Sequence, residues 1–256
     1  MLKKVLLSMA AVWLTAGFCT GPLEAGTDTA LMRFPDIHGE QVVFVHGEDI
    51  WKVSVNGGPA VRLTIHDGEE RFPKFSPDGK MIAFTAEYDG NQDVYVMDGN
   101  GGGVTRLTYH PGDDNVVGWH PVKNKVIFSS GRSSHSRFER LYMVNTDGTG
   151  LEELPIHEIC QGSFSPDGKR IAYNKTSREF RTWKRYKGGR AQDVYVYDFE
   201  TKKNERITDF EGTDRIPMWI GDKIYFTSDR DNVLNIYAYD TKTKKTEQLT
   251  RHRDYD

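Results

Sequence analysis

The residues with the clearest chemical potential form one basic and aromatic stretch in the second half of the chain. The whole chain has 37 acidic against 34 basic residues and a net charge of −3, yet this stretch has a single acidic residue, Glu179. Guanidinium and ammonium groups bind carboxylates, and aromatic rings pack against cations. The stretch therefore predicts a surface that contacts either peptides or another domain of a longer chain, through Arg178, Arg181, Trp183, Lys184, Arg185, Tyr186 and Arg190.

Other residue types that catalyse reactions or bind metals occur where a structural role explains them. Ser163 is the nearest approach to a nucleophile elbow, but its surroundings, Gly-Ser-Phe-Ser-Pro, have neither the second glycine nor a strand-to-helix turn. Four histidines each lie three residues after the Leu that ends a repeat, spread around a rim and too far apart to share a metal ion: His66, His110, His157 and His252. We therefore predict no catalytic residue, no metal site and no cofactor.

Acidic residues gather in three loops, at 67–70, 113–114 and 229–231. Their spacing is not that of a calcium-binding loop, in which ligands alternate along twelve residues. We therefore expect them to form turns and to keep the surface soluble. The near balance of charges over the whole chain also gives no electrostatic reason to expect binding to nucleic acid.

A repeat positions these residues. Its clearest unit contains Phe-Pro-Lys-Phe-Ser-Pro-Asp-Gly at 72–79, and Ser-Pro-Asp-Gly returns at 165–168. A Leu or Ile that ends each unit recurs after about 42 to 53 residues, at Leu63, Leu107, Leu154, Ile207 and Leu249. Each unit contains four short, alternating or apolar strand patterns separated by turn residues, as at 74–76, 81–84, 94–97 and 105–108. This pattern predicts β-propeller blades.

We predict an all-β fold, a β-propeller of four-stranded blades with five repeats present and a sixth only begun. The blades are expected at 33–64, 65–108, 109–155, 156–208 and 209–250, and the start of the sixth at 251–256. The first unit has all four strands, so no outer strand remains to complete a last blade. We therefore expect the N-terminal part of a longer, six-bladed propeller. Because neighbouring strands alternate in direction, the loops between second and third strands share a face with the loops between blades.

The first 25 residues are typical of a secretory signal. Lys3 and Lys4 precede an apolar segment, Val5–Phe18, that is too short to span a membrane, and cleavage after Ala25 is expected. Residues 26–32 are a short linker, and 33–256 the propeller. These features predict a periplasmic or secreted protein without a membrane span, and leave lipoprotein processing at Cys19 as an alternative.

The repeats resemble the WD40-like, PD40-type propellers of TolB and tricorn proteins. Three stretches are similar to tricorn-type serine peptidases in particular: Phe-Pro-Asp-Ile-His-Gly at 34–39 with Asp-Ile-Trp at 49–51, the basic insertion at 178–189, and Gly-Asp-Lys-Ile-Tyr-Phe-Thr-Ser-Asp-Arg at 221–230. The insertion is similar to one that these peptidases carry in the fourth blade.

The resemblance implies a propeller that gates or docks oligopeptides for catalytic domains beyond this chain, with a second propeller and a PDZ module between them. It also implies homo-oligomerisation of the full-length form, and cytoplasmic location as in archaeal relatives is an alternative to export. Two rival functions remain open: a TolB-like periplasmic protein that binds other proteins without catalysis, and the propeller of a prolyl-oligopeptidase-type hydrolase.

Overall fold

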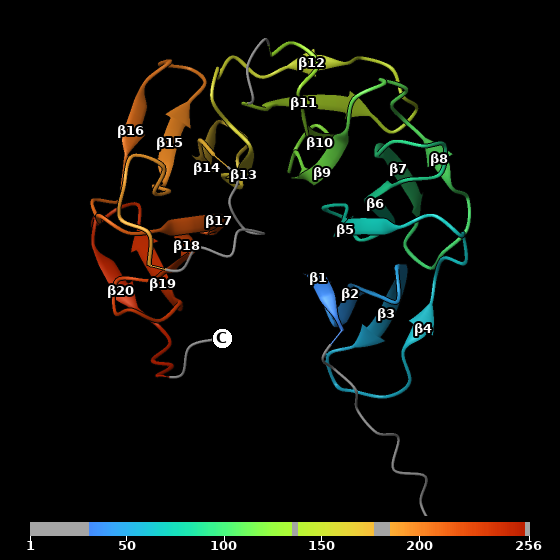
Figure 1. Cartoon of the computed structure of the whole chain (residues 1–256), viewed down its shortest axis with the longest axis horizontal. Coiled ribbons are helices and arrows are strands. Elements are labelled where there is room, and N and C mark those ends of the chain that lie inside the picture. Colours follow the sequence, from blue (N-terminus) through green and yellow to red (C-terminus); the bar gives the residue numbers. More distant parts are fainter. Residues whose placement is uncertain (1–30, 135–137, 177–184, 254–256) are drawn as a thin grey trace, which may run out of the picture. The chain divides into compact units, whose positions relative to one another are not determined.

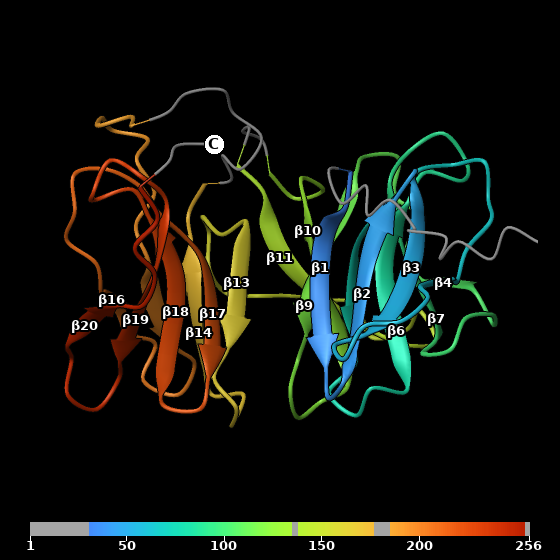
Figure 2. The same cartoon turned by 90° about the horizontal axis from the view of Figure 1, so that it is seen from below.

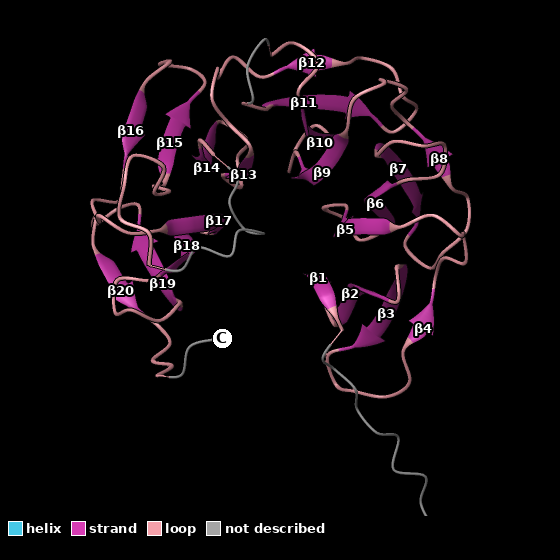
Figure 3. Ribbon diagram, in the orientation of Figure 1, coloured by secondary structure: helices cyan, strands magenta, loops and turns pink. Residues whose placement is uncertain are grey.

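The computed structural model describes residues 31–134, 138–176 and 185–253. Within these ranges, Figure 3 shows strands joined by loops and no helix. The strands form five antiparallel sheets of four strands each, and each sheet pairs its strands in chain order. The predicted all-β propeller with five four-stranded blades is confirmed. No helix in the described ranges is long and apolar enough to cross a membrane.

The strands of the five sheets have the following bounds. The first sheet contains β1 (Arg33–His38), β2 (Gln41–His46), β3 (Asp49–Ser54) and β4 (Val61–Arg62); the second contains β5 (Glu70–Phe75), β6 (Met81–Ala86), β7 (Asp93–Asp98) and β8 (Thr105–Arg106); the third contains β9 (Asp114–Trp119), β10 (Lys125–Ser130), β11 (Arg140–Asn145) and β12 (Glu152–Glu153). The fourth contains β13 (Gln161–Phe164), β14 (Arg170–Asn174), β15 (Tyr195–Asp198) and β16 (Asn204–Arg206); the fifth contains β17 (Asp214–Ile220), β18 (Lys223–Ser228), β19 (Asn235–Asp240) and β20 (Thr246–Gln248).

The five sheets follow one another around an open ring (Figure 1), with the first strand of each sheet toward the centre and the fourth strand outside. Figure 2 shows the strands running between two faces at which the loops gather. The first and fifth sheets stand at the two ends of the ring. Residues 251–253 form no strand, so a sixth blade stays a prediction.

The hydrophobic core is divided into layers, one between each pair of neighbouring sheets. Ile50 of the first sheet and Phe84 of the second belong to one buried cluster. Val96 and Phe128 share the next, Leu141 and Tyr173 the third, and Val194 and Phe226 the fourth. A stack of this kind buries both faces of the inner sheets and only one face of each end sheet.

The Thr that ends four of the repeats joins the outermost strand to its neighbour. The hydroxyl of Thr64 accepts the amide hydrogen of Ile50 at 2.8 Å, and Thr108 accepts that of Val94 at 3.0 Å. Thr208 and Thr250 hold the amides of Val194 and Ile236 in the same way, at 3.0 and 2.8 Å. Ile50, Val94 and Val194 are completely buried. Each threonine hydroxyl therefore accepts a hydrogen bond from a backbone amide that water cannot reach.

The Ser-Pro-Asp-Gly turns require their glycine for two reasons. Gly79 and Gly168 both have φ of +70°, which favours glycine. A Cβ atom at Gly79 would also lie 2.3 Å from the ring of His38 in the preceding blade, and one at Gly168 would lie 2.5 Å from the ring of His120. The turn of one blade is therefore packed against the innermost strand of the blade before it.

Each of the three acidic loops contains a buried carboxylate, Glu70, Asp114 or Asp229, so the prediction that these loops only form turns and aid solubility is wrong for these residues. Glu70 and Asp114 are completely buried, and Asp214, at the equivalent position of the fifth blade, is buried too. Each begins the innermost strand of its blade. A local sequence pattern did not reveal this, because the groups that hold these carboxylates come from later strands.

The carboxylates of the third and fifth blades are paired with an arginine that follows the second strand. Arg132 forms an ion pair with Asp114, and Arg230 Nη2 lies 3.0 Å from Asp214 Oδ1. Each arginine also donates from Nε to a serine of its own blade, Ser130 or Ser228. The guanidinium groups lie over aromatic rings, 5.1 Å from Tyr142 and 4.4 Å from Tyr237. We call this arrangement the carboxylate socket.

The fifth sheet has an uncovered apolar face. Ile216, Met218 and Ile220 alternate along β17 and are 38, 44 and 63% exposed, whereas Trp219 between them is buried. Ile236 on β19 and Leu249 are also exposed. An apolar face of this kind is a site at which another protein surface packs.

We expect replacement of Thr108 by Val to destabilise the chain by about 1–3 kcal/mol, because the buried amide of Val94 loses its acceptor. The matched control is Thr105→Val on β8, three residues earlier, where the threonine is exposed and the expected change is within about 0.5 kcal/mol. Denaturant unfolding of the three proteins measures both values. Equal losses for the two variants would show that the Thr108 hydroxyl has no special role.

We also expect Met218→Lys with Ile220→Lys to reduce self-association of the purified chain without lowering its unfolding midpoint, because both side chains lie on the uncovered face. The control is Ile65→Lys, at an isolated apolar residue that is 81% exposed in a loop. Light scattering or sedimentation measures the association. If the control reduces association as much as the double variant does, the face of β17 is not responsible.

Candidate functional site

The basic insertion leaves the fourth blade after β14 and returns at β15, as the sequence predicts. Its departure point is the side chain of Asn174, which is completely buried. Asn174 Nδ2 donates to the carbonyl oxygens of Asp193 at 2.7 Å and of Asp214 at 3.0 Å. Its Oδ1 accepts the amide hydrogen of Ile216 at 2.9 Å. The residue at which the insertion starts is thus hydrogen-bonded both to Asp193, where the insertion ends, and to the fifth blade.

A second buried amide closes the neck of the insertion. Gln192 Nε2 donates to the carbonyl oxygen of Thr176 at 2.7 Å, and the Gln192 carbonyl accepts the amide hydrogen of Asp214 at 2.7 Å. Gln92 of the second blade accepts the amide hydrogen of Asp114 in the same way, at 2.8 Å. The second and fourth blades therefore share one hydrogen bond, from the first residue of the next blade to a glutamine carbonyl oxygen. In the fourth blade this bond joins the base of the insertion to the fifth blade.

Four of the predicted contact residues, Arg178, Arg181, Trp183 and Lys184, lie outside the described residues. Arg185 is exposed, and its Nε donates to the carbonyl oxygen of Asn232 in the fifth blade at 3.1 Å. Tyr186 is half-buried, and a Cβ atom on Gly188 would lie 2.4 Å from its hydroxyl. Arg190 is exposed. The described part of the insertion thus contacts the fifth blade through Arg185.

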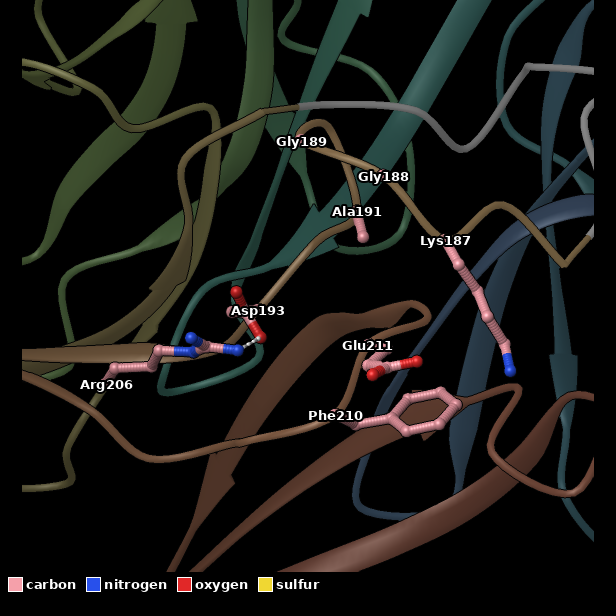
Figure 4. A pocket seen from close by; sticks show the side chains of 8 residues that line it. All are labelled: Lys187, Gly188, Gly189, Ala191, Asp193, Arg206, Phe210 and Glu211. Carbon is pink, nitrogen blue, oxygen red and sulfur yellow. Dashed lines mark hydrogen bonds and ion pairs between the residues drawn. The ribbon is translucent and has the colours of Figure 1, made fainter.

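A pocket of about 500 Å³ lies between the insertion and the loop that connects the fourth and fifth blades (Figure 4). The pocket is lined by Lys187, Gly188, Gly189, Ala191, Asp193, Arg206, Phe210 and Glu211. Sequence reasoning placed the two kinds of loop on one face but did not single out Phe210 and Glu211. Their position just after Ile207, which ends the fourth repeat, was the signal that could have identified them.

The charges of the pocket are balanced. Arg206 Nη2 pairs with Asp193 Oδ1 at 2.8 Å. Burial raises the pKa of the Asp193 carboxyl, and the hydrogen bond from Arg206 opposes that rise. Lys187 and Glu211 form no ion pair within the described ranges, and both are exposed. The pocket therefore offers one ammonium and one carboxylate to a ligand.

The floor of the pocket is the ring of Phe210, which is held in place from behind. A Cβ atom on Gly212 would lie 2.3 Å from that ring and 2.5 Å from a carboxylate oxygen of Asp229. The guanidinium group of Arg230 lies 5.5 Å from the ring centroid. An aromatic floor beside opposite charges suits a peptide segment, which carries apolar, cationic and anionic groups together.

The residues that resemble a nucleophile or metal ligands have structural roles. Ser163 lies within β13, and its hydroxyl accepts the amide hydrogen of Trp219 at 2.9 Å. His66 and His110 accept the amide hydrogens of Gly68 and Gly112 at 3.0 Å through Nδ1. These contacts give Ser163, His66 and His110 structural roles. Among the described residues, no group of three His, Cys, Asp or Glu side chains converges as metal ligands would.

Comparison with known proteins agrees with this architecture. The chain is 31% identical over 207 residues to tricorn protease homolog 1 of Streptomyces coelicolor, an alignment that covers 79% of this chain and 19% of the relative. The tricorn protease crystal structure superposes with a TM-score of 0.78 at 27% identity, over 88% of this chain and 23% of that one. TolB from Acinetobacter baumannii gives a TM-score of 0.67 at 22% identity, over 88% of this chain and 55% of that one, and shows a shared fold alone.

The chain spans about a fifth of the length of the tricorn protease homologs of Streptomyces coelicolor and Saccharolobus solfataricus. The family model that matches residues 29–256 describes the tricorn protease N-terminal β-propeller domain, and that match covers the whole described region. This chain belongs to the family of tricorn protease N-terminal β-propellers.

Proposed function

We propose that this propeller docks oligopeptides for a peptidase domain that lies outside the chain, and that the pocket beside the fourth-blade insertion is the contact site. The observation that carries the proposal is that Lys187 and Glu211, which form no ion pair within the described ranges, line the same pocket as the ring of Phe210. Peptides present ammonium, carboxylate and apolar groups within a few ångströms of one another, so a charge-balanced pocket suits them better than a uniformly basic one. Family membership supports the same role.

The role requires no chemistry from the propeller itself. The side chains of Ser163, His66 and His110 accept backbone amide hydrogens. The chain would instead raise the local concentration of peptide, and the loops around the pocket would admit an extended segment more readily than a folded protein. Export through residues 1–25 belongs to the proposal as well, and would place this activity in the periplasm or outside the cell.

Attachment to another part of a longer protein is a second candidate role, which the uncovered face of β17 favours. Ile216, Met218 and Ile220 on that face are apolar and exposed. This role is compatible with peptide docking, because the pocket and the face of β17 use different side chains. Arg185 also shows that the insertion makes contacts between blades as well as facing solvent.

Peptide docking predicts that charge reversal at the insertion weakens peptide binding. The variant is Lys187→Glu with Arg190→Glu, and the control is Lys203→Glu with Lys245→Glu, which are exposed lysines in the turns between third and fourth strands at the opposite face. Fluorescence anisotropy with a labelled nonapeptide of mixed composition measures affinity. We expect at least a tenfold loss for the insertion variant, less than a twofold loss for the control, and a decline of wild-type affinity as salt rises.

Equal losses for the two variants would show that total charge, rather than this pocket, governs binding. Intact peptide after prolonged incubation with the purified chain is also expected. Hydrolysis that survives removal of contaminating proteases would contradict the assignment of catalysis to another domain.

A further inference from the structure

The second blade has a carboxylate socket without the arginine. Its carboxylate is Glu70, and Tyr88 takes the place that Arg132 has in the third blade. The Tyr88 ring lies 4.7 Å from that of Tyr95, just as Arg132 lies over Tyr142. The Tyr88 hydroxyl donates to Glu70 Oε1 at 2.6 Å. The neutral phenol of Tyr88 therefore hydrogen-bonds the buried carboxylate in the position that a guanidinium group has in the third blade.

Glu70 also joins the first blade to the second. The Thr64 hydroxyl, at the end of the first blade, lies 2.9 Å from Glu70 Oε2 and also holds the amide of Ile50. The backbone amide of Glu70 donates to the carbonyl oxygen of Glu48 at 2.9 Å. Because Glu70 is completely buried, the seam between the two blades depends on a carboxyl group that water does not solvate.

The surroundings of Glu70 disfavour its charge. Asp49 on β3 is a second buried acid, and its Oδ1 has no hydrogen-bond partner. Arg62 on β4 is the nearby cation, but it is engaged with Asp49 Oδ2 at 2.6 Å. His66 lies over the Tyr88 ring with centroids 3.8 Å apart, and its Nδ1 accepts a backbone amide hydrogen.

The charged residues next in sequence pair with one another. Glu69 forms an ion pair with Arg71, and Glu87 adds a further negative charge near that arginine. Burial is the largest effect on Glu70. It raises the pKa of the Glu70 carboxyl to about 7, the hydrogen bonds from Tyr88 and Thr64 oppose the rise, and the charge of Asp49 adds to it.

We propose that Glu70, Tyr88 and Thr64 form a pH-sensitive latch, which holds the first and second blades together when Glu70 is protonated and loosens when Glu70 is ionised. The proton on Oε2 would be donated to the Thr64 hydroxyl oxygen, so the neutral carboxyl keeps both contacts. Loss of the proton leaves a buried negative charge with no cation bonded to it, which is costly. The loop at 65–69, which connects the two blades on the same face as the insertion, would be released first.

The direction of the pH dependence follows from the two states of the carboxyl. In the unfolded chain a glutamate titrates near pH 4.3, whereas in the folded chain Glu70 keeps its proton to about pH 7. The latch therefore contributes fully below about pH 4.3 and loses its contribution as the pH rises to about 7. Above that pH the carboxyl is ionised in both states, and no further loss is expected.

Hydrogen exchange of the intact chain tests the latch locally. The amides of Ile50 and Glu70 report on this seam, and the amide of Val116, which donates to Thr85 Oγ1 at 2.8 Å across the next seam, is the internal control. After correction for intrinsic exchange, we expect opening of the first seam to increase up to about a hundredfold between pH 5 and 7.5. We expect opening at Val116 to change much less.

Two variants separate the latch from a general pH effect. Glu70→Gln should abolish the pH dependence at Ile50, because the side chain no longer titrates. Tyr88→Phe removes a bond that favours the ionised carboxylate and should move the midpoint to higher pH, so it tests the latch even if Glu70→Gln does not fold. Seam opening that is independent of pH in the natural chain, or an unchanged midpoint in Tyr88→Phe, would overturn the proposal.

Discussion

A buried carboxylate at the start of the innermost strand imposes the constraint on which the rest of this propeller depends. Asp114 and Asp214 are inaccessible to water, and an ionised carboxylate in such a place must be paired and hydrogen-bonded. The guanidinium groups of Arg132 and Arg230 supply the pairing and cover the aromatic rings of the same blade. The start and end of a blade's first hairpin are therefore locked together, and the neighbouring blade packs on a surface of defined shape.

The insertion depends on the same constraint. The amide of Asp214 donates to the Gln192 carbonyl oxygen, and the Asn174 side chain donates to the Asp214 carbonyl oxygen and accepts the amide hydrogen of Ile216. The socket of the fifth blade and the neck of the fourth-blade insertion are thus one continuous hydrogen-bonded unit. Arg230 also lies against Phe210, the floor of the pocket. These hydrogen bonds and ring contacts lie beneath the pocket, and such support can hold the geometry of charges that a loop presents to a ligand.

The sequence predicted the blades well because their signals are local. Alternating or apolar strand patterns identified the strands of every repeat, helped in the second and fourth by Ser-Pro-Asp-Gly turns. The threonines that follow four of the repeated Leu or Ile residues are hydrogen-bond acceptors beside the outermost strand. The sockets were missed because their partners lie in different strands: Glu70 and Tyr88 are 18 residues apart, and the acidic loop looks like a solvent-exposed turn. The bulges at Phe34, Phe72 and Ile216 were missed too, since φ near +55° before a proline is rare.

Of the predicted contact residues, only Arg185, Tyr186 and Arg190 fall within the described ranges. The pocket is also lined by Phe210 and Glu211, which were missed because their loop contains no cluster of like charges.

The pairing of carboxylate and arginine in the sockets is what holds the blades together. A double-mutant cycle on Asp214 and Arg230 tests it most directly, with Asp214→Asn, Arg230→Met and the two combined, and the free energy of unfolding as the measured quantity. Each single change should cost about 3 kcal/mol, because each leaves a buried polar or charged partner unpaired. The double change should cost at least about 1 kcal/mol less than the sum of the two. Additive losses would show that the two side chains act independently, and would contradict the claim.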